Sequence, residues 1–344
     1  MIRFECDYAE GAHPEIIKRL TDTNLEQTSG YGEDGHCANA RRLIRLACDA
    51  KNADVHFLVG GTQTNMTVIA AALRPHQGVI AAETGHINVH ETGAVEATGH
   101  KVIALPTKDG KLTAEQIAQT VRAHHNDPNH EHIVQPAMVY ISNPTETGTI
   151  YYKSELEAIS AVCREAAIPL FLDGARLGYG LAAEGNDLTL KDIATLCDVF
   201  YIGGTKVGAL FGEAVVITND ALKRDFRYLM KQRGAMLAKG RLLGIQFETL
   251  FEDGLYFRIS QHAIDMAVLI RDAFRAKSYS FLCESPTNQQ FPILTQQQID
   301  ALKQDFAFEI WTQTSENTFA VRFCTSWATR KEDVENVINA IPAA

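Results

Sequence analysis

The segment PLFLDGAR (169–176) places an acid, Asp173, directly after an apolar run, and a base, Arg176, three positions later. The apolar residues before Asp173 are typical of a strand that is buried on both faces in a parallel sheet. Burying a carboxylate is unfavourable unless a partner compensates for the lost water. We therefore expect Asp173 to pair with a positively charged group.

A lysine follows a second apolar run, in the segment YIGGTKVGAL (201–210). Glycines on both sides clear space around Lys206. In a partly desolvated pocket a lysine loses its proton more readily and becomes a nucleophile that can form a Schiff base. A surface lysine in a loop explains this segment equally well.

The segment GGTQTN (60–65) reads as a glycine turn that leads into a helix. Backbone N–H groups at such a helix N-terminus attract an anion, and Thr62 can add its hydroxyl. The segment matches neither the dinucleotide-binding glycine pattern nor the P-loop. An ordinary helix start is the alternative interpretation.

Two histidines, His86 and His90, stand four residues apart in ETGHINVHETGA (83–94) and would share one face of a helix. No third ligand follows at a suitable spacing, so we expect no metal site. The segment HHNDPNHEH (124–132) is polar and is expected to be a solvated loop.

The elements that must position these residues alternate between strand and helix from about residue 50 to 220. The apolar runs that predict strands are VHFLVGG (55–61), GVIAAE (78–83), HKVIALP (100–106), AMVYISNP (137–144), PLFLDGA (169–175) and DVFYIGGTK (198–206). This alternation predicts an α/β fold, a mostly parallel sheet with helices on both faces. Ligands bind at the carboxyl ends of such strands, where the residues described above lie.

Helices connect these strands and continue after them. Thr113 and Ser154 are expected to cap helices, because Gln116 and Glu157 stand three residues on. Residues 221–275 look helical, and the remainder predicts a smaller α/β unit. We expect an N-terminal segment near the active site (1–15), a large cofactor-binding domain (16–250) and a small C-terminal domain (251–344).

Taken together, a glycine turn for an anion, a flat imidazole, a buried acid and a lysine meet the needs of one cofactor, pyridoxal 5'-phosphate (PLP). Its phosphate suits the helix N-terminus and its aldehyde requires a lysine. Its pyridine nitrogen must stay protonated, which a carboxylate ensures. Asp173 would then pair with the pyridinium.

Composition limits the other classes of partner. The 344 residues are 46% hydrophobic and carry a net charge of -10, which argues against nucleic acid and anionic membranes. No apolar run is long enough to span a bilayer, and the N-terminal stretch lacks a targeting pattern. Seven scattered cysteines without a C-x-x-C pair predict reduced thiols and a cytoplasmic location.

These motifs, together with VRFCTSWAT (321–329), resemble those of the threonine aldolases, in the beta-eliminating lyase group of fold type I PLP enzymes. For the cofactor, the resemblance implies phosphate contacts from Gly61, Thr62 and Thr205, and His86 on the ring. It also implies Asp173 at the ring nitrogen and Lys206 as the covalent attachment point. Arg176 would contact both the cofactor and the substrate.

For the substrate, the resemblance makes Arg322 a clamp on the carboxylate, together with Arg176. Asp7, in the N-terminal segment, is also expected to bind the substrate. The catalytic residues would be Lys206, His86 and Asp173.

Three segments depart from the family pattern. CDY (6–8) replaces a serine–aspartate–threonine run, and in NPTET (143–147) Thr145 or Glu146 stands in place of a histidine. In GAMLAKGR (234–241), Lys239 or Arg241 would offer a positive charge to the phosphate of a neighbouring subunit.

The activity implied is cleavage of a β-hydroxy-α-amino acid, threonine or allo-threonine, to glycine and an aldehyde. His86, His90 or a water bound by the phosphate would act as the base. The alternatives are PLP-dependent β-elimination or amino-group transfer on another amino acid, and a binder without chemistry. An open sheet of this size, with active-site charges from a distant helix, also suggests a homodimer or homotetramer.

Overall fold

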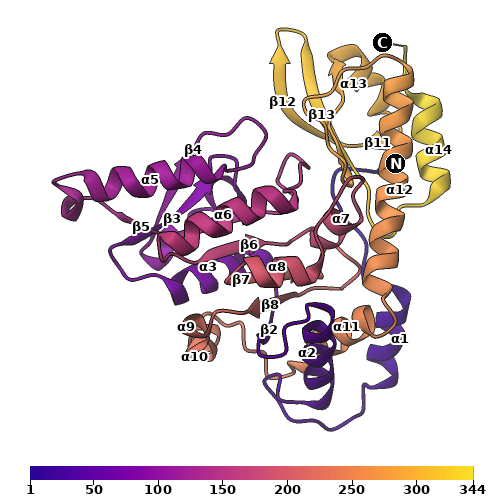
Figure 1. The fold of residues 1–344 in the computed structure, drawn as a ribbon. Coiled ribbons are helices and arrows are strands. Elements are labelled where there is room, and N and C mark those ends of the chain that lie inside the picture. Colours follow the sequence, from indigo (N-terminus) through magenta and orange to yellow (C-terminus); the bar gives the residue numbers. More distant parts are fainter. Residues whose placement is uncertain (344) are drawn as a thin grey trace.

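The computed structural model describes residues 1–343, and its centre is a seven-stranded sheet (Figure 1). The spatial order of the strands is β2 (Asp54–Leu58), β8 (Glu213–Ile217), β7 (Val199–Gly203), β6 (Leu170–Asp173), β5 (Gln135–Ser142), β3 (Gln77–Ala82) and β4 (Lys101–Leu105). All of them run in one direction except β8, which is antiparallel to both of its neighbours.

Helices cover both faces of this sheet. One face packs against the helices α3 (Gly61–Ala72), α4 (His86–Val89) and α10 (Phe226–Gln232). The other face packs mainly against α2 (Gly35–Ala47), α5 (Ala114–Asn126), α6 (Lys153–Glu165), α8 (Leu190–Leu196) and α11 (Arg241–Glu252). The expected fold class is therefore confirmed.

A second, smaller unit is built on a separate core. Its strands are β9 (Gln289–Gln290), β10 (Ile293–Thr295), β12 (Glu309–Ser315) and β13 (Thr318–Cys324), and its helices are α13 (Gln296–Leu302) and α14 (Lys331–Ala340). The N-terminal strand β1 (Ile2–Arg3) pairs with β11 (Phe306–Ala307) of this unit, and Phe4 is buried in its core. The first residues of the chain therefore pack with the last ones.

The long helix α12 (Leu255–Ala276) joins the two units (Figure 1). Its first half, including Tyr256 and Ile259, packs in the large core, whereas Ile270 and Phe274 pack in the small one. The short helix α7 (Leu177–Ala182) lies against it. Because one continuous helix belongs to both cores, the two units hold a fixed relation to each other.

The helix starts test the capping predictions. Thr113 caps α5 with Gln116 as expected. The prediction for Ser154 was wrong, because α6 begins at Lys153, where Glu155 accepts a hydrogen bond from the backbone N–H of Tyr152 at 2.8 Å. The remaining helices are α1 (Pro14–Asp22) and α9 (Asp220–Lys223). Within residues 1–343, no helix has both the length and the apolar character that crossing a bilayer requires.

Candidate active site

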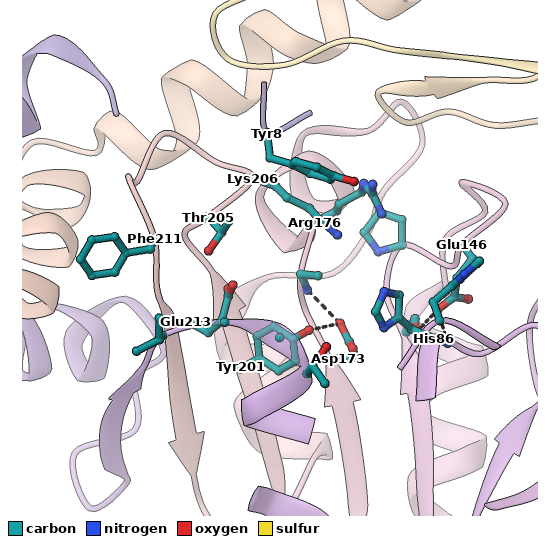
Figure 2. Close-up of a pocket in the computed structure, with 18 of the residues that line it drawn as sticks. Tyr8, His86, Glu146, Asp173, Arg176, Tyr201, Thr205, Lys206, Phe211 and Glu213 are labelled. Atoms are coloured by element: carbon teal, nitrogen blue, oxygen red, sulfur yellow. Dashed lines mark hydrogen bonds between the residues drawn. The ribbon is translucent and has the colours of Figure 1, made fainter. Parts of the chain in front are cut away.

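One cavity of about 550 Å³ lies at the carboxyl edge of the parallel strands (Figure 2). Its walls combine residues that end β6 and follow β2 and β7 with residues from the N-terminal segment, β12 and β13. Eight of the residues expected at the site line it, namely Gly61, Thr62, His86, Asp173, Arg176, Thr205, Lys206 and Arg322. The ninth, Asp7, is buried and contacts Arg176.

Asp173 ends β6 and is surrounded by neutral donors. Its Oδ2 accepts hydrogen bonds from the Asn65 amide at 3.0 Å and from the Tyr140 hydroxyl at 2.5 Å. Its Oδ1 accepts from the Tyr201 hydroxyl and from the Ala175 N–H. Burial keeps the pKa of both tyrosine hydroxyls well above their usual value, so they stay protonated and donate. Asp173 is thus fixed in place without a cation from residues 1–343.

Lys206 follows β7 and reaches into the same cavity, with its Nζ 6.0 Å from the centre of the Tyr8 ring. Burial lowers the pKa of this amine, and the positive charge of Arg176 lowers it further. Among the described residues, Nζ makes no ion pair. A larger fraction of neutral amine is therefore available as a nucleophile.

The glycine turn at the start of α3 completes a place for an anion. Gly60 is the residue before the helix and offers no side chain to cap it, so the first N–H groups lack a side-chain acceptor. A Cβ on Gly61 would lie 3.3 Å from the Tyr201 hydroxyl oxygen, which makes glycine the suitable residue there. Gly60, Gly61 and Thr62 line the cavity together with Thr205.

His86 is held by a buried acid. Its Nδ1 lies 2.8 Å from Oε1 of Glu91, whose side chain is fully buried, so Nδ1 carries the proton toward the carboxylate. The Asn65 amide donates both to Glu91, at 2.7 Å, and to Asp173. His90 lies beside His86, with ring centres 5.5 Å apart. In residues 1–343, no three metal-binding side chains are grouped to hold an ion.

Arg176 forms an ion pair within the chain. Its Nε and Nη2 donate to Asp7 at 2.6 and 3.0 Å, and Asn288 also donates to Asp7 at 3.0 Å. Burial alone would raise the pKa of Asp7, but Arg176 and Lys206 outweigh burial and hold it at about 2. Asp7 is therefore charged, and it orients Arg176 at the wall of the cavity.

Arg322 lies on β13 at the rim. It donates to the Glu5 carbonyl at 2.9 Å and to Gln289 at 3.2 Å, and it pairs with Glu309. Its guanidinium lies 5.1 Å from the centre of the Trp311 ring. Its Nε is buried and has no partner in residues 1–343.

Two basic residues named from the sequence lie away from this cavity. Arg241 donates to the carbonyls of Asn24 and Glu26, and Lys239 is exposed.

Sequence reasoning missed Tyr140, Tyr201 and Glu213. The two tyrosines lie within apolar strands and looked like core residues. Glu213 begins β8, a strand that was not singled out from the sequence, and it accepts a hydrogen bond from the Gly204 N–H at 3.1 Å. Burial raises the pKa of Glu213, which lies in the cavity lining near Thr205 (Figure 2).

The residues present fit PLP. An uncapped helix N-terminus suits the phosphate, an amine without an ion pair suits the aldehyde, and a buried carboxylate with neutral donors suits a protonated ring nitrogen.

Comparisons with known proteins give the family. The family description "Beta-eliminating lyase" matches residues 6–297. A low specificity L-threonine aldolase from Pseudomonas aeruginosa is 30% identical over 338 residues, 97% of this chain and 94% of that protein. The structure of a Leishmania major threonine aldolase has 48% identity and a TM-score of 0.96, covering 99% of this chain and 98% of that one.

A more distant structure shares the fold alone. A mutant of Thermus thermophilus aspartate aminotransferase is 13% identical, with a TM-score of 0.73 over 99% of this chain and 90% of that one. The resemblance to threonine aldolases and the expectation of PLP are thereby confirmed. This chain belongs to the beta-eliminating lyase family of fold type I, PLP-dependent enzymes.

Proposed function

We propose that this enzyme cleaves β-hydroxy-α-amino acids of the threonine type to glycine and an aldehyde. The relatives named above carry threonine aldolase in their names and match nearly the whole chain. The observation that carries the proposal is the presence, in one cavity, of a lysine amine without an ion pair in residues 1–343 and a buried carboxylate held by neutral donors.

In this proposal Gly61, Thr62 and Thr205 would hold the phosphate, and Lys206 would bind the aldehyde. Asp173 would keep the ring nitrogen protonated, and His86 would contact the ring. When bound, PLP withdraws electrons from the bond that breaks at Cα.

The substrate carboxylate is bound by Arg322, with Arg176 beside it. The planar guanidinium fork suits a carboxylate, because it offers two parallel hydrogen bonds. Asp7 contributes by fixing Arg176 in place. Its own carboxylate would repel that of the substrate, so we assign it this indirect part in substrate binding.

A product assay tests the reaction. The PLP-loaded enzyme is incubated with threonine, allo-threonine, phenylserine, serine and cysteine, and the products are measured as glycine, aldehyde, pyruvate and sulfide. We expect glycine and aldehyde in equal amounts from the first three substrates. Pyruvate without aldehyde would refute the proposal and favour β-elimination.

We further propose that the enzyme works in the cytoplasm as a homodimer or homotetramer. We also propose that the large domain spans residues 16–250 and the small domain residues 251–344. Reduced thiols and the net charge of -10 support the location. Exposed apolar side chains such as Leu25, Tyr228 and Phe257 support association. Light scattering coupled to size exclusion measures the mass, and a mass of one chain would refute the association.

A further inference from the structure

A buried carboxyl group faces the cavity on the side of His86. Glu146 lies in the loop after β5, is 9% exposed and lines the cavity (Figure 2). Its Oε1 accepts hydrogen bonds from the Ser142 hydroxyl at 2.7 Å and from the His86 backbone N–H at 2.9 Å. Within residues 1–343, its Oε2 has no hydrogen-bond partner and no cation pairs with it. One oxygen therefore fixes the group and the other is available to a ligand.

Two hydroxyl groups lie between this carboxyl group and the centre of the site. Ser142 donates its proton to Glu146 and Tyr140 donates its proton to Asp173, and the two hydroxyl oxygens lie 3.3 Å apart. Ser142 and Asp173 are also paired residues in the register of β5 and β6. The position of Glu146 relative to Asp173 is therefore set by neighbouring strands, as a reacting group requires.

The other acids near the site are engaged or do not line the cavity. Asp173 is surrounded by four donors. Glu91 pairs with His86 and is not part of the cavity lining, although its buried Oε2 has no partner in residues 1–343. Asp7 and Glu309 are paired with arginines. Glu213 lies on the opposite side of Asp173, near Thr205 (Figure 2). Among the acids that line the cavity in residues 1–343, Glu146 is thus the one with a free oxygen on the His86 side.

Burial raises the pKa of Glu146, although its two donors counteract part of this effect. A carboxylate with a raised pKa is a stronger base than one in water. Burial and the adjacent His86 lower the pKa of His90, which also lines the cavity, so this imidazole is a weaker base than one in water. The titratable groups that face Glu146 are Asp173, Tyr140, Tyr151 and His86.

We propose that Glu146 is the general base that removes the proton from the substrate's β-hydroxyl group, with Ser142 positioning it. This inference rests on the proposed aldol cleavage. The O–H bond breaks and the proton passes to Oε2, while the oxygen's electron pair forms the carbonyl of the aldehyde. The Cα–Cβ bond breaks, its electron pair stays with Cα, and Cα takes a proton to give glycine. Glu146 returns its proton to solvent, so no further reactant is needed.

Two reactions of the PLP-loaded enzyme separate this role from a general defect. Threonine cleavage needs the β-hydroxyl proton to be removed, whereas exchange of the glycine α-hydrogen in D₂O, followed by NMR, does not. In Glu146→Gln we expect kcat for cleavage to fall about 10²- to 10⁴-fold, with glycine exchange within about twofold of wild type. Glu146→Asp should restore part of the cleavage, because it keeps the carboxylate.

A positioning variant serves as the matched control. Ser142→Ala keeps the carboxyl group and removes one donor, so we expect a smaller loss of about tenfold. Loss of that donor also raises the pKa of Glu146 and should move the acid limb of kcat/KM to higher pH. In Glu146→Gln this limb should disappear.

A stability measurement, which does not depend on enzyme activity, checks that the carboxyl group of Glu146 is buried and titrates. Because the pKa of Glu146 is raised on folding, its contribution to stability is present at low pH and lost as pH rises through the folded value. The Tm of the cofactor-free wild type should therefore fall relative to Glu146→Gln as pH increases.

The inference is overturned if Glu146→Gln keeps wild-type cleavage, or if it loses cleavage and glycine exchange equally. A wild-type enzyme that exchanges glycine but cleaves no β-hydroxy amino acid would instead refute the proposed function.

Discussion

Replacing Asp7 with asparagine tests whether a buried ion pair joins the N-terminal segment to the active site. Asp7 is fully buried, and it accepts two hydrogen bonds from Arg176. Removing one partner of a buried pair leaves an uncompensated charge, which costs about 3–5 kcal/mol. For 344 residues the unfolding entropy is about 0.7 kcal/mol/K, so Tm should fall by about 4–7 °C.

Calorimetry of the cofactor-free protein measures this loss in Asp7→Asn, Arg176→Gln and the double variant. The double variant should lose less than the sum of the single losses, by about 1 kcal/mol or more, because it leaves no unpaired charge. Asp22→Asn is the matched control, since the Lys18–Asp22 pair is exposed and should contribute less than about 1 kcal/mol. Additive losses, or a decrease below about 1 °C in Asp7→Asn, would refute the reasoning.

The same pair predicts a pH dependence. The folded pKa of Asp7 is lowered to about 2, so its contribution to stability is present above its ordinary pKa and lost as pH falls toward 2. A shift of nearly two units corresponds to about 2 kcal/mol. The difference in Tm between wild type and Asp7→Asn should therefore shrink between about pH 4 and pH 2.

Three further variants test the site and its support. Lys206→Ala should bind no PLP covalently and give no turnover; a yellow, active variant would contradict the assignment of this lysine. Glu309→Gln removes the acid that pairs with Arg322 and would compete with the substrate carboxylate. In initial-rate assays KM for threonine should therefore fall about three- to tenfold, while kcat stays within about twofold. An unchanged or raised KM would contradict this competition. Gly178→Ala would place a Cβ 2.3 Å from Ser260 Oγ and 2.9 Å from the Tyr256 ring. The free energy of unfolding should therefore fall by about 1–3 kcal/mol, as measured by chemical denaturation. A denaturation midpoint equal to that of wild type would show that α7 and α12 can separate at this point.

The sequence predicts the location of the site better than its interior. Parallel strands bring their carboxyl ends to one edge of a sheet, so residues as distant as Gly61, Asp173 and Lys206 could be expected together. The structure does bring them to one cavity. Helix starts are harder to predict from local patterns, since α6 begins before Ser154 because Glu155 and Asp187 accept hydrogen bonds from the N–H groups of Tyr152 and Lys153.

The donors around Asp173 could not be predicted, because they depend on which strands flank β6. Tyr140 and Tyr201 stand in apolar runs and are typical core residues when each run is considered separately. Only the strand order β7, β6, β5 places one tyrosine on each side of Asp173. Strand order follows from the packing of the whole chain, and one sequence does not contain it in any local pattern.

Two of the buried acids of the site, Asp7 and Asp173, show how the surroundings of a carboxylate separate structural from chemical roles. Asp7 is neutralised by Arg176, so its charge is already matched within the chain. Within residues 1–343, Asp173 is held by hydroxyl and amide donors alone, which stabilise a negative charge without cancelling it. An arginine in place of Tyr201 would satisfy the same oxygen and remove the charge that a protonated ring nitrogen requires. Neutral donors around a buried acid at a strand end therefore indicate a cationic ligand more directly than the acid itself.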